Sequence, residues 1–124
     1  MATIKLDCDR GIKWRRIRDV VQIFKLEVNF SKSKIFRTKK GHHIYLEVTN
    51  DLNDEFICFL QCAMGSDYRR ECLNWRRIKF GEQWQKDTWN VLFAKKYYVD
   101  TKGNMTLASE EIEIDNEILR RKLK

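Results

Sequence analysis

The sequence predicts one α+β domain in which strands and helices alternate. Residues 4–9 and 43–48 alternate between apolar and polar side chains, as half-buried strands do. Residues 12–25 and 51–64 instead repeat their apolar side chains at the spacing of a helix. The length of 124 residues suits one domain, and 43% of them are hydrophobic, which is enough for a core. We therefore expect residues 1–124 to form a single domain.

The first strand, residues 4–9, ends in two acidic residues. Asp7 and Asp9 are two positions apart, so they point to the same face, away from the apolar side chains of the strand. A turn at Gly11 follows. The apolar residues of 12–25 then recur at helical spacing opposite a basic face, which predicts an amphipathic helix.

A β-hairpin is expected next. Alternation over residues 33–38 indicates a strand, and residues 39–41 form a tight turn because glycine permits unusual backbone angles. In the following strand, 43–48, the side chains of His43 and Tyr45 point to the face opposite the apolar residues.

Two consecutive helices are expected after the hairpin. Residues 51–64 form the first, which Gly65 ends. Ser66 can cap a second helix that continues through Ile78.

The remaining residues predict a strand and an extension. Residues 89–99 form a strongly apolar strand, and residues 105–114 return from a turn as the second arm of a hairpin. Residues 115–124 form a short charged helix or are frayed.

The order β-α-β-β-α-β is that of a ferredoxin-like, or RRM-like, sheet with helices on one face, here followed by a C-terminal hairpin and helix extension. In that sheet the first and third strands lie side by side in the middle. The two alternations then place Asp7 and Asp9 on the same open face as His43 and Tyr45.

The charge balance indicates an anionic partner. The net charge is +7 and the isoelectric point is about 9.3, which favours nucleic acid, DNA or RNA, or a nucleotide. No apolar run approaches the ~20 residues of a membrane span, and the N-terminus lacks a secretory segment. We expect an intracellular, cytoplasmic protein without a membrane partner. Whether it forms a homodimer stays open.

Asp7 and Asp9 predict a site for Mg²⁺ or Mn²⁺. Two adjacent carboxylates repel each other unless a cation lies between them. The alternative is that both residues simply close the strand and lead into the turn, a common role of aspartate.

His43 and its neighbours predict phosphoryl chemistry beside that metal. A divalent cation neutralises phosphate charge and activates an oxygen nucleophile. His43 would contact a phosphate or shuttle a proton, while Arg37, Lys39 and Lys40 would bind the phosphate backbone. The alternative for His43 is an ordinary exposed position on the sheet.

These motifs resemble the archaeo-eukaryotic primase-polymerase superfamily. The first motif of that family is an acidic pair separated by one residue at a strand end, as in Leu-Asp-Cys-Asp at 6–9. Its second is Ser-x-His before a strand, similar to Lys-Lys-Gly-His-His-Ile-Tyr at 39–45. The resemblance implies an RRM-like catalytic half in which Asp7 and Asp9 bind the catalytic metals and His43 contacts the phosphates of the incoming nucleotide.

The sequence also departs from that family. Gly41 stands in the place of the motif serine, and no acid lies in the strand 89–99 to supply the third motif. Three aspartates outside that strand are candidates for it: Asp67, Asp87 and Asp100. The 124 residues also lack the additional N-terminal half of the family. The resemblance therefore implies a reduced, degenerate or repurposed relative of the archaeal plasmid or virus type.

A second RRM-like class, the rolling-circle replication nuclease, fits less well. It requires His-hydrophobic-His on the strand, which His42-His43-Ile44 does not provide, although Tyr68 could be its helical nucleophile.

The segment 67–77 is dense in arginine and aromatic residues. Its arginines can pair with phosphates, and its aromatic rings can stack on bases. The arginines proposed for nucleic-acid binding are Arg69, Arg70, Arg76 and Arg77. The alternative is an amphipathic helix that buries Leu73 with Trp75 or Ile78 and leaves a solvated arginine face. Trp84 and Trp89 are expected in the core.

A binding module without catalysis is the competing function. The open sheet face and the arginine helix would bind nucleic acid or an acidic protein, with Tyr45 as a stacking residue. Divalent-metal dependence separates the two functions, because a plain binder responds to salt and ignores a chelator.

The cysteines could offer another metal site. Cys58 and Cys62 are four apart on a helix, so they could ligate a metal together with Cys72 or a histidine. We favour buried or half-buried thiols for all four, including Cys8.

Overall fold

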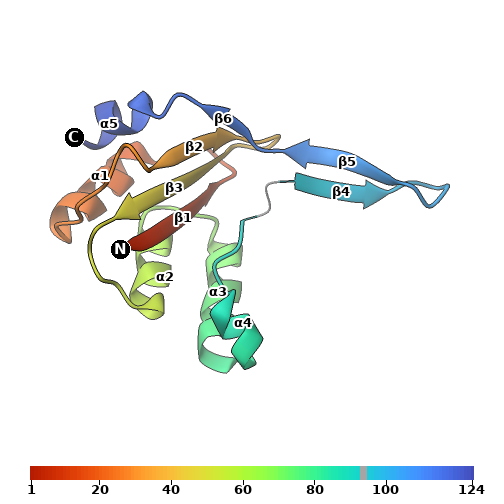
Figure 1. The fold of residues 1–124 in the computed structure, drawn as a ribbon, viewed down its shortest axis with the longest axis horizontal. Helices are drawn as coiled ribbons and strands as arrows, with labels where there is room; N and C mark the ends of the chain where they lie inside the picture. The colour runs from red at the N-terminus through yellow and green to blue at the C-terminus, as the bar shows by residue number, and fades with distance from the viewer. Residues whose placement is uncertain (93–94) are drawn as a thin grey trace.

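A four-stranded antiparallel sheet with helices packed against it forms the body of the protein (Figure 1). The computed structural model describes residues 1–92 and 95–124. Within them the strand order of the sheet is β1-β3-β2-β6, and a separate hairpin pairs β4 with β5. The strands are β1 Ala2–Cys8, β2 Lys34–Arg37, β3 His42–Val48, β4 Lys95–Val99, β5 Met105–Glu110 and β6 Ile112–Ile114. The helices are α1 Trp14–Ile23, α2 Asp54–Ala63, α3 Tyr68–Phe80, α4 Gln83–Asp87 and α5 Glu117–Leu123.

The predicted alternation of β1 and β3 is confirmed. Ile4 and Leu6 of β1 pair with Leu46 and Ile44 of β3, and all four side chains are fully buried. They face α1, α2 and α5, whose apolar residues complete one core. Each buried side chain of this size contributes about 1.5–3 kcal/mol relative to exposure. The period-two pattern therefore determines which face of the sheet carries polar residues.

The C-terminal tail is a helix rather than a frayed end. Leu119 and Leu123, four residues apart on α5, are both buried against the core. Asn116, just before α5, donates from its side chain to the carbonyls of Phe30 and Ser33, at 3.0 Å each. These contacts fix the extension against the segment that precedes β2.

The fourth strand does not take the place that the ferredoxin-like order predicts. That order places residues 89–99 next to β1, so that β1 lies in the middle of the sheet. Among the described strands β1 is instead at the edge, and β4 pairs with β5 in a hairpin that projects from the body (Figure 1). Residues 93 and 94 of the predicted strand lie outside the described residues. On the other side of the sheet, β6 extends β2.

The edge of β1 is closed by side chains and a loop from α2 and α3. The amides of Lys5 and Asp7 donate to the side chains of Gln61, at 2.9 Å, and Ser66, at 3.0 Å. The amide of Asp67 donates in turn to the carbonyl of Asp7 at 2.8 Å. Because these bonds satisfy the backbone groups that another strand would need, the edge has no room for β4.

Candidate functional site

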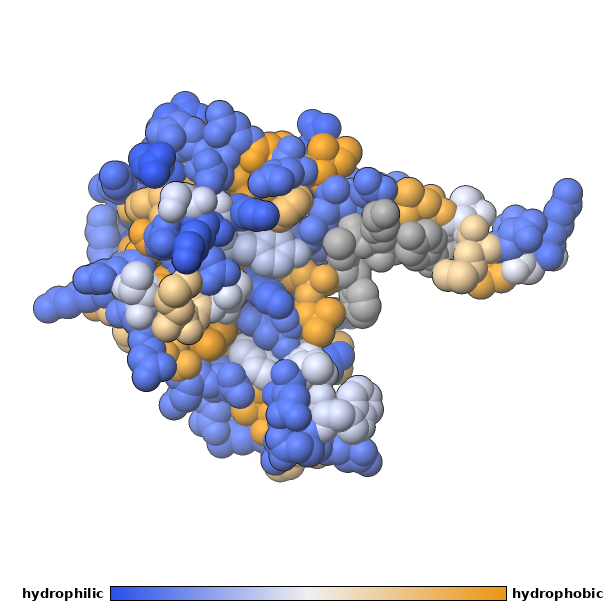
Figure 2. Space-filling model, in the orientation of Figure 1, coloured by the Kyte–Doolittle hydropathy of each residue, from blue (hydrophilic) through white to orange (hydrophobic). Residues whose placement is uncertain are grey.

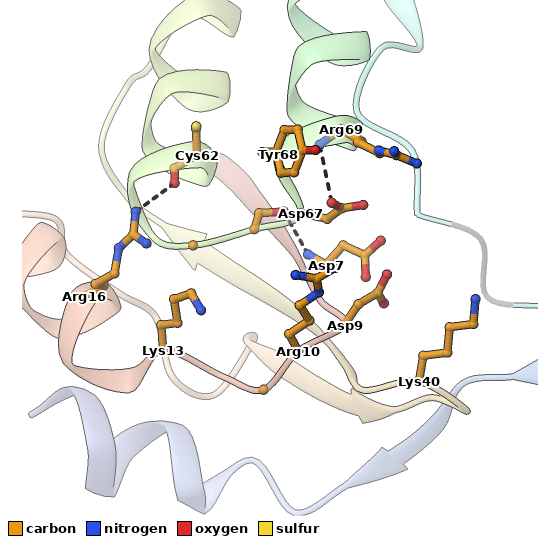
Figure 3. A pocket seen from close by; sticks show the side chains of 13 residues that line it. Asp7, Asp9, Arg10, Lys13, Arg16, Lys40, Cys62, Asp67, Tyr68 and Arg69 are labelled. Atoms are coloured by element: carbon orange, nitrogen blue, oxygen red, sulfur yellow. Dashed lines mark hydrogen bonds between the residues drawn. The ribbon is translucent and has the colours of Figure 1, made fainter.

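Three aspartates meet at the end of β1. Asp7 is on the strand, Asp9 follows it, and Asp67 caps the N-terminus of α3 by accepting from the amide of Arg69. One carboxylate oxygen from each lies within 4.8 Å of the others (Figure 3). Of the three acids that the sequence offers for the missing third motif, the structure thus brings Asp67 to the predicted pair. We call Asp7, Asp9 and Asp67 the aspartate trio.

Asp7 is the most perturbed member of the trio. Burial raises its pKa to about 6, and a hydrogen bond and charge repulsion from Asp9 add to this effect. The opposite contributions of His43 and Arg70 are smaller. Oxygen Oδ1 of Asp7 is buried and accepts no hydrogen bond among the described residues, although it lies 3.6 Å from Nε2 of His43. Such an orphaned acceptor in a carboxylate cluster fits a hard divalent cation, which prefers oxygen ligands.

His43 is held between two carboxylates. Its Nε2 is 3.6 Å from Oδ1 of Asp7, and its Nδ1 is 2.6 Å from Oε1 of Glu111. The hydroxyl of Tyr45 donates to the same oxygen of Glu111. Because a carboxylate accepts, this arrangement places a proton on Nδ1 and turns Nε2 toward Asp7.

The predicted shared face is confirmed, but at His43 it is not open. Asp7 pairs with His43 and Lys5 with Tyr45 in the register of β1 and β3. His43 is only 3% exposed, so the alternative of an ordinary exposed position on the sheet is wrong. The side chain of Glu111, between β5 and β6, approaches from the C-terminal extension. Nothing in the alternating pattern of residues 105–114 marks Glu111 as a buried partner of this histidine.

A large cavity opens beside the aspartate trio. Its volume is about 870 Å³, and its wall combines the three carboxylates with cationic side chains from several segments (Figure 3). These cations are Arg10, Lys13, Arg16, Lys40 and Arg69. Acidic oxygens surrounded by cations match a ligand that is itself a cation bound to phosphate groups.

Of the three cations predicted at and before the turn that precedes β3, only one lines this cavity. Lys40 lines the wall, whereas Lys39 is exposed and does not line it. Arg37 pairs in register with His42, so its side chain is on the opposite face of the sheet from His43. The structure therefore does not bring Arg37 to the aspartate trio.

Gly41 in this turn has a steric role. A Cβ at this position would lie 2.1 Å from the backbone oxygen of Cys8. A serine there, as in the family that the motif resembles, would force the turn away from the end of β1. Glycine therefore replaces the motif serine here because the turn packs closely against the end of β1.

The arginines of α3 have different surroundings. Arg69 lines the large cavity, and Arg76 and Arg77 line another one, of about 310 Å³, near the end of the helix. Arg70 is instead a structural residue: it pairs with Glu71 and donates to the carbonyl of Lys5 at 3.1 Å. Because these bonds occupy the Arg70 guanidinium, it is not free to bind phosphate as the sequence predicts.

The buried face of α3 is polar, contrary to expectation. Glu71 and Asn74 are 3% and 1% exposed, whereas Leu73 and Trp75 are 50% and 42% exposed. Sequence reasoning missed this inversion because charged residues in a helix are normally assigned to solvent. Trp84 is also exposed, so its expected place in the core is wrong, while Trp89 is buried as predicted.

The expectation of buried or half-buried thiols is confirmed for two of the four cysteines and is wrong for Cys62 and Cys72. Cys8 and Cys58 are buried, Cys62 and Cys72 are exposed, and all four are free. Burial raises the pKa of the Cys8 and Cys58 thiols to about 12. In the part of the chain that the structure describes, the aspartate trio is the one cluster of three or more metal-ligating residues, and it contains no cysteine.

Comparison of the chain with models of known protein families, with curated proteins and with solved structures finds no match. None of the helices in the described residues is long and apolar enough to cross a membrane.

Proposed function

We propose that this protein binds nucleic acid or a nucleotide and holds Mg²⁺ or Mn²⁺ at Asp7, Asp9 and Asp67 for phosphoryl transfer of the primase-polymerase-like or nuclease-like kind. One observation carries the proposal. Three carboxylates from two distant segments converge, one with an orphaned oxygen, in a cavity whose other charged residues are cations. A cation supplies charge neutralisation and activation of an oxygen nucleophile when bound.

The residues around the trio have distinct proposed roles. Lys40, Arg10 and Lys13 lie on the cavity wall and would bind the phosphates of the ligand. His43 is buried behind Asp7 and would act as a positioning residue that keeps the Asp7 carboxylate toward the cavity. Its 3% exposure does not favour direct contact with phosphate.

The proposal also covers the fold to which the sheet is related and the cellular compartment in which the protein acts. The antiparallel order β1-β3-β2 is that of three strands of a ferredoxin-like, RRM-like sheet, and we propose this relation for the segment from β1 to α3. We also propose that the protein acts inside the cell on DNA or RNA, in replication or a related process of a mobile element. The net charge of +7 supports the nucleic-acid ligand.

The alternative function is a non-catalytic binding module. The burial of His43 under Glu111 favours it, because no histidine among the described residues then lines the trio cavity to move a proton. This alternative predicts nucleic-acid binding that falls with salt and is unchanged by a chelator.

Titration with Mn²⁺ by calorimetry tests the proposed site. We expect the parent to bind Mn²⁺, and Asp7→Asn with Asp9→Asn to abolish that binding while the circular dichroism spectrum stays the same. Asp67→Asn should weaken binding roughly 10-fold or more, since one charged ligand is lost.

Asp87→Asn is the matched control, because Asp87 is exposed on α4 and is not part of the trio. It should bind Mn²⁺ like the parent. If the double variant binds Mn²⁺ as well as the parent does, the metal site is wrong. Metal binding that is unaffected by a nucleoside triphosphate or a short strand would favour the non-catalytic alternative.

A further inference from the structure

Four residues form a stripe along the exposed side of α3. Arg69, Leu73, Arg76 and Phe80 are spaced by four, three and four positions, which places all of them on one face of a helix. Arginine and apolar residue alternate along the stripe. We call these four residues the α3 stripe.

The stripe is not part of the core. Leu73 is 50% exposed and Phe80 is 82% exposed, while the helix buries Glu71 and Asn74 on another side. Within residues 1–92 and 95–124, neither the Arg69 nor the Arg76 guanidinium has a hydrogen-bond or ion-pair partner. Figure 2 shows hydrophobic residues among hydrophilic ones on the lobe where Figure 1 places α3 and α4.

Three cavities with lining residues in common lie between the aspartate trio and the end of α3. A cavity of about 250 Å³ shares Asp7, Asp67 and Arg69 with the large cavity. The same cavity shares Leu73 and Arg77 with the cavity at the end of α3. Residues of α3 thus line all three cavities, and we call these cavities together the α3 groove.

We propose that this groove binds single-stranded nucleic acid along α3. Arg69, Arg76 and Arg77 would contact successive phosphates, and Phe80 and Leu73 would contact bases between them. Unpaired bases expose their faces to stacking, whereas the bases of a duplex are already stacked, so a stripe of alternating cation and apolar contacts suits a single strand. The inference rests on the proposed function for its ligand class and adds where, and in which form, that ligand binds.

Binding of a labelled single strand to charge-reversed variants tests the groove. The probe is a fluorescein-labelled oligo(dT), or oligo(rU), of about 12 nucleotides, measured by anisotropy in EDTA so that the trio holds no metal. We expect Arg69→Glu with Arg76→Glu to weaken binding roughly 10-fold or more. The slope of log K against log salt concentration, called the salt slope below, should become less steep by about 1.4, as for two lost phosphate contacts.

The matched control is Arg15→Glu with Arg18→Glu on α1, which makes the same change in net charge at exposed positions away from the groove. This control should weaken binding much less at physiological salt, where long-range attraction is screened. Circular dichroism checks the fold. Arg69→Gln with Arg76→Gln is a second, milder pair and should give a smaller loss in the same direction.

Phe80→Ala separates stacking from charge. It should weaken binding about 5-fold or more with an unchanged salt slope. Phe59→Ala, at another exposed phenylalanine outside the groove, should have little effect.

Three results would overturn the groove: equal losses in the stripe and control variants, failure of the parent to bind either strand, or a duplex that competes as strongly as the single strand. Failure of the metal site is distinguishable, because it shows in Mn²⁺ binding alone. Strand binding by the stripe in EDTA would stand even if Asp7→Asn with Asp9→Asn left Mn²⁺ binding unchanged.

Discussion

Two carboxylates beside the edge of β1 have opposite environments. Both oxygens of Glu71, on α3, are satisfied: Oε1 accepts from Gln61 at 2.8 Å and from Asn74 at 3.0 Å, and Oε2 accepts from Ser66 at 2.6 Å and pairs with Arg70. Asp7 instead keeps one buried oxygen without a hydrogen-bond partner among the described residues.

The difference separates a structural carboxylate from one that is available to a ligand. A buried charge with a full set of donors is stable as it stands, and its bonds hold α2, α3 and β1 together. A buried acceptor without a partner lowers stability until a ligand supplies one. In the proposed function, a missing hydrogen bond therefore distinguishes the metal ligand Asp7 from the structural carboxylate of Glu71.

Removal of the Glu71 carboxylate should give the largest effect. Glu71→Ala leaves the Arg70 guanidinium and the donors of Gln61 and Asn74 without their shared acceptor, and we expect a loss of about 3–5 kcal/mol in the free energy of unfolding. Denaturant unfolding measures it. The control is Glu55→Ala, which breaks only an exposed ion pair with Lys79 and should cost less than about 1 kcal/mol. Equal losses for both variants would contradict the structural role of Glu71.

Glu111 should come next, because its carboxylate is also shared by two partners, the buried His43 and the half-buried Tyr45. Glu111→Ala removes the acceptor of both His43 Nδ1 and the Tyr45 hydroxyl, and we expect a loss of about 1–3 kcal/mol. The nitrogen chemical shifts of the His43 ring, measured by NMR, should change because Nδ1 loses its partner. Glu110→Ala, at the exposed neighbouring position, is the control and should leave these shifts unchanged. Unaltered His43 shifts in Glu111→Ala would mean that Glu111 does not orient the ring.

The same contrast explains what could be predicted from the sequence. Alternation located β1 and β3 and brought Asp7, His43 and Tyr45 to one face, because the period of a strand depends on local geometry alone. It could not show that Glu111 reaches His43, because that contact joins residues far apart in the chain. Glu71 lies close in sequence to its partners Gln61 and Ser66, but the pattern could not show that this polar face of α3 is the buried one. The displaced β4 also depends on contacts between distant segments, since the side chains of Gln61 in α2 and of Ser66 in the loop after it occupy the edge of β1.

The effect expected at Asp7 differs from the other two, because its size should depend on pH. Burial raises the pKa of Asp7 from an ordinary 3.8 to about 6, so between these values the folded state binds more protons than the unfolded state. The contribution of this group to stability is therefore fully present below pH 4 and is lost as the pH rises through 6. Asp7→Asn cannot ionise, so the variant should gain stability relative to the parent over this range and keep the gain above it.

Unfolding of the parent and of Asp7→Asn, measured without divalent metal from pH 4 to 8, checks this sign. Parallel curves for the two proteins would show that Asp7 is as well satisfied in the folded state as Glu71 is. Addition of Mn²⁺ at pH 7 should then stabilise the parent and leave Asp7→Asn with Asp9→Asn unchanged, because only the parent offers the cation its oxygens. A carboxylate that destabilises the free protein and stabilises the metal-bound one would act as a ligand, whereas Glu71 would stabilise the fold under both conditions.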